Sequence, residues 1–239
     1  MKRIGQVATY PARVENLPRM LESVVGQLDE IHVVLNEYSQ RQQRKLPTYD
    51  NVRYLIPEHD LKDTGKFLRP ASADEFIFLM DDDLIFPPDY AARLIEFHRG
   101  AGTPRIAVGL HGVIYSDLFE GAPSSRFVSK FDKALERPML VNQLGTGCLM
   151  MRGDLMPPFS FMQSAQQFVD VRFARYCHEA GIARLCVSRP AGWIVDQAPE
   201  TSIFETFTRL RHVEQLDEIL TFGGYGRLEG KLAVAVEAL

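Results

Sequence analysis

The stretch of sequence that decides the fold is residues 76–90, which read FIFLM, then DDD, then LIFPPDY. An unbroken apolar run bounded by charge is typical of a strand that is buried on both faces of a largely parallel sheet. Three carboxylates, Asp81, Asp82 and Asp83, follow where that strand ends. Ligands of open α/β sheets bind in the crevice outside the carboxyl ends of the strands, so we expect these side chains to face a ligand.

The three carboxylates also predict a metal–phosphate site. Side chains alternate along a strand, so Asp81 and Asp83 would leave on one face and Asp82 on the other. Two carboxylates that share a face repel each other unless a cation lies between them, and Mg²⁺ and Mn²⁺ prefer such oxygen ligands. The alternative is a solvated acidic turn. The rigid strand before the triplet and the Pro-Pro pair after it favour the metal site.

Apolar periodicity extends this strand into an α/β domain. Strands are predicted at residues 4–8, 30–35, 52–56, 76–80, 106–110, 144–151 and 183–187, and helices at residues 17–28, 63–66, 88–99, 169–180 and 204–220. Residues 115–136 mix glycine, proline, serine and charge, which predicts a long loop. The alternation of strands and helices implies a mostly parallel sheet flanked by helices, with right-handed crossovers.

The composition is that of an ordinary globular domain. The chain has 239 residues, of which 46% are hydrophobic and 24% are charged, and such a chain buries a core easily. Its formal net charge is -4 and its basic residues are scattered, which gives no electrostatic footprint for nucleic acid. The short basic cluster at residues 41–45, RQQRK, is interpreted as a solvated loop.

Targeting features and cysteines predict a cytoplasmic protein. The longest apolar runs are far shorter than a membrane span, and the first residues lack the apolar region of a signal peptide. A peripheral association with a membrane stays open. Cys148, Cys177 and Cys186 are odd in number, widely spaced and in apolar surroundings, so we interpret them as buried thiols in a reducing compartment. No Cys or His spacing predicts zinc.

Three segments carry a resemblance to a known family. Residues 78–90 are similar to the Asp-X-Asp segment of the GT-A glycosyltransferases, in particular bacterial members of glycosyltransferase family two. Residues 8–13 and 29–36 resemble the nucleotide-binding opening of these enzymes, and residues 63–67 resemble the segment after their third strand. Together these segments cover roughly the first 110 residues, and a weaker match extends to about residue 210.

The resemblance implies a single GT-A domain over residues 1–239, with a Rossmann-like nucleotide-sugar-binding half at about 1–110 and an acceptor-binding half at about 111–239. It implies a metal-dependent, inverting hexosyltransferase that uses Mn²⁺ or Mg²⁺. A sugar would pass from a UDP-linked donor to a hydroxyl of a glycan or lipid-linked acceptor, in the assembly of a bacterial surface polysaccharide. Two alternatives stay open. One is a nucleotidyltransferase that makes nucleotide-sugars, although residues 8–16 lack its Gly-rich loop. The other is a glycan- or nucleotide-binding domain without catalysis.

By the same resemblance, donor and metal are held at the strand ends. Asp83 would be the direct metal ligand, Asp81 would face the metal and the ribose, and Asp82 would be a structural neighbour within the donor site. The pocket for base and ribose would be built from the residues after the first three strands, namely Thr9, Pro11, Arg13, Asn36, Asp63 and Lys66. For Arg13 and Lys66, a plain surface charge is the alternative.

The general base is predicted at Asp170. The resemblance implies that an Asp or Glu at a helix start beyond the metal site takes the acceptor proton. Asp170 lies at such a predicted helix start, where a carboxylate that only stabilises the helix is the alternative, and Asp154 is the competing base. The Gly-rich residues 145–147 would lie under a bound sugar. Two further roles stay open: His212 as a metal ligand, and Trp193 as a sugar-stacking or a core residue.

Overall fold

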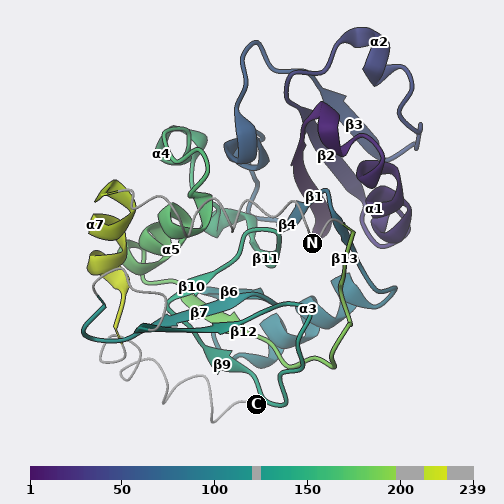
Figure 1. Cartoon of the computed structure of the whole chain (residues 1–239). Helices are drawn as coiled ribbons and strands as arrows, with labels where there is room; N and C mark the ends of the chain where they lie inside the picture. The colour runs from purple at the N-terminus through teal and green to yellow at the C-terminus, as the bar shows by residue number, and fades with distance from the viewer. Residues whose placement is uncertain (120–124, 198–212, 225–239) are drawn as a thin grey trace.

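The computed structural model describes residues 1–119, 125–197 and 213–224. Its centre is an eight-stranded sheet of strand order β3-β2-β1-β4-β11-β6-β12-β9 (Figure 1). The strands are β1 (Lys2–Thr9), β2 (Glu30–Leu35), β3 (Val52–Leu55), β4 (Glu75–Asp81), β6 (Ile106–Gly109), β9 (Met139–Leu140), β11 (Cys148–Arg152) and β12 (Ala183–Cys186). Parallel pairs join β3, β2, β1 and β4 in turn, and also β6 and β12. The predicted mostly parallel α/β sheet is confirmed.

β4 is the strand predicted from residues 76–80, and it lies between β1 and β11. Its side chains alternate between two hydrophobic cores. Phe76, Phe78 and Met80 pack into one core, and Ile77 and Leu79 pack into the other. Burying an apolar side chain of this size stabilises a fold by about 1.5–3 kcal/mol relative to leaving it exposed. A strand that is buried on both faces therefore anchors the whole sheet.

Helices cover both faces of the sheet (Figure 1). The helices α1 (Asn16–Val24) and α3 (Tyr90–Gly100) pack into the core that contains Phe78. The 3-10 helix η2 (Lys62–Phe67) and the helices α4 (Phe159–Met162) and α5 (Val169–Glu179) pack into the core that contains Leu79. The predicted apolar stripe of the first helix runs from Leu17 to Leu28. Its members Leu17, Met20, Leu21 and Val24 are buried in α1, Leu28 is buried after the helix ends, and Val25 is half-buried.

Two smaller sheets complete the described part of the chain. One has the strand order β10-β7-β8, with bounds Gln143–Leu144, Gly112–Tyr115 and Arg126–Ser129. The other pairs β5 (Leu84–Ile85) with β13 (Val195–Asp196). The three-stranded sheet, α5 and α7 (Val213–Phe222) enclose a third core. Short connections are η1 (Pro11–Arg13), α2 (Gln40–Gln43) and η4 (Gly153–Leu155).

Several local predictions need correction. The strand predicted at 144–151 is two strands, β10 and β11, because the Gly-rich residues 145–147 form a turn between them. The loop predicted at 115–136 contains β8. β4 ends at Asp81, and Asp82 and Asp83 lie in a turn, so strand alternation does not set where these two side chains point. The first nine residues of the helix predicted at 204–220 lie outside the described residues, and Val213–Phe222 form α7.

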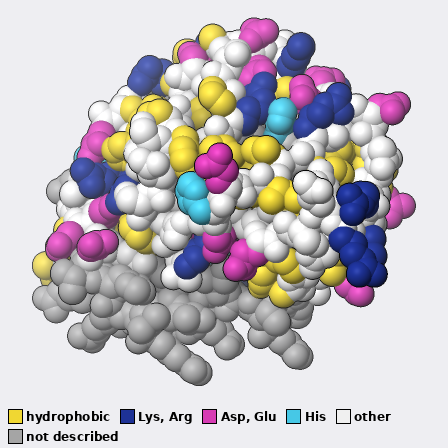
Figure 2. Space-filling view, turned by 90° about the horizontal axis from the view of Figure 1, so that it is seen from above, with side chains coloured by type: hydrophobic (Ala, Val, Ile, Leu, Met, Phe, Trp, Pro, Cys, Tyr) yellow, Lys and Arg dark blue, Asp and Glu magenta, His cyan; other side chains and the backbone are white. Residues whose placement is uncertain are grey.

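The surface and the helices bear on two of the sequence-based expectations. Within the described residues, no helix combines the length and the apolar character that crossing a membrane requires. On the face shown in Figure 2, basic and acidic side chains are interspersed, and hydrophobic side chains lie among them. This mixture agrees with a chain of formal net charge -4.

Candidate active site

A cavity of about 520 Å³ lies at the carboxyl ends of β1, β2 and β4. Its walls are completed by η2, by the turn at residues 145–147, by the first turn of α5 and by β7 and β8. We call it the strand-end cavity. The predicted site residues that line it are Thr9, Arg13, Asn36, Asp63, Lys66, Asp81, Asp82, Asp83 and Asp170. Pro11 is not among its lining residues and lies in η1, two residues before Arg13.

Lys66 is buried at the floor of this cavity and is not a surface lysine. Its side chain is 4% exposed, and its Nζ donates a hydrogen bond to Oδ1 of Asp81 at 2.6 Å. Burial by itself lowers the pKa of Lys66, but the carboxylates of Asp81, Asp170 and Asp63 raise it further than burial lowers it. The ammonium therefore stays charged and acts as a fixed internal counter-ion.

Arg13 is likewise a buried counter-ion, and its partner is Asp83. The two side chains form an ion pair at 2.7 Å, and the arginine side chain is 7% exposed, so the surface-charge interpretation of Arg13 is wrong. Burial raises the pKa of Asp83 to about 6; the charge of Asp81 raises it too, and Arg13 opposes both. Burial likewise raises the pKa of Asp82 to about 7, with the neighbouring carboxylates adding to the effect. Negative charge is crowded at this end of β4.

The crowded carboxylates fit a divalent cation that is held partly by the protein and partly by the phosphate oxygens of a bound nucleotide. One oxygen of Asp81 and one of Asp83 are used in the ion pairs, and the other oxygen of each lies outside them. Within the described residues there is no group of three or more His, Cys, Asp or Glu side chains placed to hold a metal. Mg²⁺ does not need such a cage, because one or two carboxylates with phosphate oxygens and waters complete its coordination.

Asn36 and Asp63 both use side-chain atoms to shape the rim of the cavity. Asn36 donates to the carbonyl of Lys62 at 2.9 Å and accepts from the amide of Leu61 at 3.0 Å. Asp63 accepts from the amide of Gln167 at 2.8 Å, and burial raises the pKa of its carboxyl to about 6. Asn36 therefore ties β2 to the segment before η2, and Asp63 ties η2 to the loop before α5.

Backbone strain is concentrated at the same rim. Within the described residues, the non-glycine residues with positive φ are Glu37 at 58°, Lys62 at 48° and Gln167 at 72°. All of them line the strand-end cavity, although they come from distant parts of the chain. Residues with side chains rarely adopt this conformation, which costs of order 1–3 kcal/mol for each residue and persists where the surroundings enforce it. Such residues cluster at functional sites, which favours this cavity as the site of chemistry.

Asp170 faces the turn at residues 145–147 and does not cap its own helix. Its Oδ1 accepts hydrogen bonds from the amide of Thr146 at 2.8 Å and from the Thr146 hydroxyl at 2.6 Å. The competing Asp154 follows the far end of β11, where it pairs with Arg152 at 2.9 Å. Because β11 runs antiparallel to β4 and starts beside Met80, Asp154 lies at the opposite edge of the sheet from the cavity.

The two residues left open by the sequence differ in outcome. Trp193 is half-buried and packs against the core: its ring lies 6.2 Å from that of Tyr90, and the Arg93 guanidinium stacks on it at 5.2 Å. It does not line the strand-end cavity, so of its two interpretations the core residue is correct. His212 lies outside the described residues.

Sequence reasoning missed His111, which lines the cavity from the short connection between β6 and β7. Burial lowers the pKa of its imidazole, while the carboxylate of Asp170 opposes that effect. Its ring lies 6.1 Å from the ring of Phe131, another lining residue. The available signal was position: His111 is the first residue after the strand predicted at 106–110, at the edge of the sheet where Asp81 also emerges.

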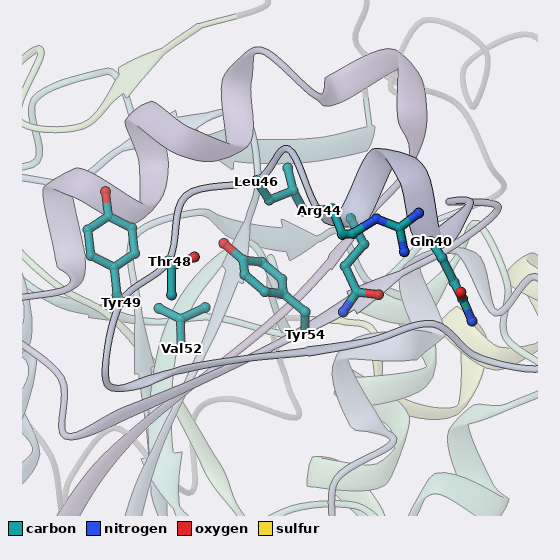
Figure 3. Close-up of a pocket in the computed structure, with 8 residues that line it drawn as sticks. Gln40, Arg44, Leu46, Thr48, Tyr49, Val52 and Tyr54 are labelled. Atoms are coloured by element: carbon teal, nitrogen blue, oxygen red, sulfur yellow. The ribbon is translucent and has the colours of Figure 1, made fainter.

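A second hollow, of about 540 Å³, lies between α2 and β3 (Figure 3). It is lined by Gln40, Gln43, Arg44, Leu46, Thr48, Tyr49, Val52 and Tyr54. All of these residues belong to one connection between neighbouring strands or to β3 itself, and none carries a carboxylate. It has no candidate general base or metal ligand, so the strand-end cavity is the candidate active site.

No protein-family model and no curated protein sequence matches the chain. Two solved structures of S. aureus TarS, residues 1–349, are similar to it. The first has a TM-score of 0.52 and 16% identity, and the match covers 93% of this chain and 66% of that one. The second, a complex with UDP-GlcNAc, has a TM-score of 0.52 and 14% identity, with 99% and 76% covered. TarS is a GT-A-type glycosyltransferase.

This chain has a GT-A-like fold. The fold implied by the segments at residues 8–13, 29–36, 63–67 and 78–90 is therefore confirmed. At 14–16% identity the likeness establishes the architecture alone. The roles of individual side chains in the GT-A-like fold of this chain have to be argued from its own cavity, charges and hydrogen bonds.

Proposed function

We propose that this chain is a metal-dependent, inverting glycosyltransferase. Its donor is a nucleotide diphosphate sugar, with UDP as the nucleotide and a hexose as the sugar, and its acceptor is a hydroxyl of a glycan or a lipid-linked glycan. The setting is surface-polysaccharide assembly on the cytoplasmic side of a membrane. The proposal is supported by the GT-A-like fold and by the complex of the similar TarS structure with UDP-GlcNAc.

One observation carries the proposal. A single cavity at the strand ends brings together the carboxylates of Asp81 and Asp83, the buried cations Lys66 and Arg13, and the carboxylate of Asp170. Sugar transfer from a nucleotide diphosphate needs these parts: groups that balance charge on the leaving diphosphate, and a base for the acceptor hydroxyl. The residues come from β4 and the turn after it, η1, η2 and α5, so only the folded chain assembles them.

Each side chain has a part in the proposed reaction. Asp83 and Asp81 would hold Mn²⁺ or Mg²⁺, which when bound stabilises the charge that develops on the leaving diphosphate. Arg13 and Lys66 hold these carboxylates in place through their ion pairs. Asp170 takes the proton from the acceptor hydroxyl, and that oxygen attacks the sugar carbon from the side opposite the leaving diphosphate. The bond between this carbon and the diphosphate oxygen breaks, and the configuration inverts.

The donor nucleoside is proposed to lie over the ends of β1 and β2. Thr9 ends β1 and Asn36 directly follows β2, both at the cavity, and Asp63 lines the same cavity from η2. Asn36 has one amide hydrogen beyond the bond to Lys62, so it can still donate to a base or ribose. The nucleotidyltransferase alternative requires a Gly-rich loop that binds a triphosphate after β1. In this chain the segment after β1 is η1, which contains no glycine.

The test is a binding and turnover series on the purified chain. Thermal unfolding would be followed with UDP-glucose, UDP-galactose and UDP-N-acetylglucosamine, each with Mn²⁺ and with EDTA. A ligand that binds only the folded state raises its stability, so the donor should raise the melting temperature with Mn²⁺ and much less with EDTA. Release of UDP, with water or added oligosaccharides as acceptors, should then fall roughly 10²–10⁴-fold in Asp170→Asn. Full activity of that variant would contradict the assignment of the base.

A further inference from the structure

Thr146 holds the carboxylate of Asp170 in one direction. Its backbone amide and its hydroxyl both donate to the same oxygen, Oδ1, at 2.8 and 2.6 Å. Thr146 itself is 1% exposed, so water does not compete for these donors. A carboxylate on the first turn of a helix could otherwise rotate about its side-chain bonds. With Oδ1 fixed by two donors, Oδ2 is the oxygen left outside these bonds.

The hydroxyl of Thr146 is in turn held by Lys66. Lys66 Nζ lies 3.3 Å from the hydroxyl oxygen and 3.4 Å from the carbonyl oxygen of Thr146. A hydroxyl has one proton to donate, and here that proton goes to Asp170, so the oxygen accepts from the ammonium. The result is a series of hydrogen bonds, donated from Lys66 to Thr146 and from Thr146 to Asp170. Lys66 also donates to Asp81, which connects this series of hydrogen bonds to the donor side of the cavity.

The turn that carries Thr146 is fixed on both sides. The amide of Gly145 donates to the carbonyl of His111 at 2.8 Å, and the amide of Asp81 donates to the carbonyl of Gly147 at 2.9 Å. A Cβ atom on Gly147 would lie 2.0 Å from Oδ2 of Asp81, so a glycine is required where the turn passes that side chain. Thr146 is therefore placed by the end of β4 and by the connection between β6 and β7.

We infer that Thr146 is the positioning residue that aims Asp170 at the acceptor hydroxyl, with Lys66 holding Thr146 against the donor-side carboxylate. The inference rests on the proposed function, because it takes Asp170 as the base. Transfer of a proton needs the base within hydrogen-bond reach and in a fixed direction, and a displacement of about 1 Å can cost 10²-fold in rate. If Thr146 only stabilised the turn at residues 145–147, its replacement would lower the stability of the fold and would have no effect on kcat that depends on Asp170.

The experiment is a double-mutant cycle with a rescue variant. Thr146→Val keeps the shape and the backbone amide but removes the hydroxyl, and Thr146→Ser restores the hydroxyl. Each is made in the wild-type chain and in Asp170→Asn. The measurements are kcat and KM for UDP release from the UDP-sugar that the wild type turns over, UDP affinity by calorimetry, and the melting temperature. Should Thr146→Val fail to fold, Thr146→Ala takes its place.

The expected result is a loss in kcat that acts through Asp170. The free energy of a hydrogen bond to a charged group corresponds to a factor of about 10–100 in a rate constant. Thr146→Val should therefore lower kcat by that factor and change UDP affinity less than about twofold. Thr146→Ser should stay within about threefold of wild type. In the Asp170→Asn chain, Thr146→Val should add almost no further loss, since residues that act as a unit are not additive.

Three results would overturn the inference while the proposed function stands. The first is a wild-type chain that turns over its donor while Thr146→Val keeps most of the kcat. The second is an equal loss in Thr146→Val and Thr146→Ser that is matched by weaker UDP binding, which is the signature of a structural role. The third is an undiminished effect of Thr146→Val in Asp170→Asn. A wild-type chain that releases UDP from no UDP-sugar would overturn the proposed function, and the inference with it.

Discussion

Replacing Asp82 by asparagine tests the charge crowding at the end of β4. Burial, aided by the charges of Asp83 and Asp81, raises the pKa of Asp82 from 3.8 to about 7. Because the folded-state pKa lies above the unfolded one, the folded chain binds more protons between these pH values, and its stability falls as the pH rises through them. At 1.36 kcal/mol for each pKa unit, the raised pKa of Asp82 costs about 4 kcal/mol of stability at pH 8, where the side chain is ionised. At pH 4.5, where the folded chain keeps it protonated, the cost is only about 1 kcal/mol.

The asparagine introduced by Asp82→Asn is neutral at both pH values, so the substitution should stabilise the chain by those amounts. For 239 residues, an unfolding entropy of about 2.1 cal/mol/K per residue converts 4 kcal/mol to a rise of roughly 8 °C in melting temperature at pH 8. Urea unfolding followed by circular dichroism at pH 8.0 and 4.5 measures both free energies. Asp89→Asn, at an exposed carboxylate, is the matched control and should change stability by less than about 0.5 kcal/mol. An equal effect of Asp82→Asn at the two pH values, or destabilisation at pH 8, would refute the electrostatic argument.

Three further predictions concern the ligand and the turn. Asp83→Ala should remove the gain in UDP-sugar affinity that Mn²⁺ gives over EDTA, while leaving the fold intact. If calorimetry shows that the wild type binds the UDP-sugar equally well with Mn²⁺ and with EDTA, metal dependence is contradicted. Asp63→Ala should weaken UDP itself, because Asp63 lines the cavity and ties η2 to the loop before α5; unchanged UDP affinity would remove it from the nucleoside pocket. Gly147→Ala should abolish turnover, because its Cβ would displace the Asp81 carboxylate, whereas Gly26→Ala, with no atom within 4 Å of the added Cβ, should leave turnover within about twofold of wild type by UDP release.

The sequence predicted the parts of the fold that follow from apolar periodicity. The run at residues 76–80 indicated β4 because a strand buried on both faces has to be apolar throughout, and the carboxylates after it indicated the ligand edge of the sheet. The direction of β11 was not predictable in this way, since a buried apolar run pairs equally well in parallel or antiparallel. β8 was missed because four residues in a polar segment give too short a pattern to recognise.

The ion pairs of the site lay beyond what sequence patterns can show. Lys66 lies fifteen residues before Asp81, and only the packing of η2 against β1 places its ammonium beneath that carboxylate. Arg13 meets Asp83 across seventy residues. A pattern of residue types indicates which side chains end near the same edge of a sheet. It does not indicate which of them are buried together, and it is burial that makes Lys66 and Arg13 counter-ions of the carboxylates and not surface charges.

The charge balance of the strand-end cavity explains why a cation belongs in the proposed reaction. Its lining carries the acidic residues Glu37, Asp60, Asp63, Asp81, Asp82, Asp83 and Asp170 against the basic residues Arg13, Lys62, Lys66 and Arg126. Seven acidic against four basic side chains give a formal charge of -3 when all are ionised. A nucleotide diphosphate is itself an anion, and like charges in a partly buried cavity repel strongly. A divalent cation that enters with the diphosphate brings two positive charges, which offset the charge of the diphosphate where it would meet Asp81 and Asp83, the most crowded carboxylates.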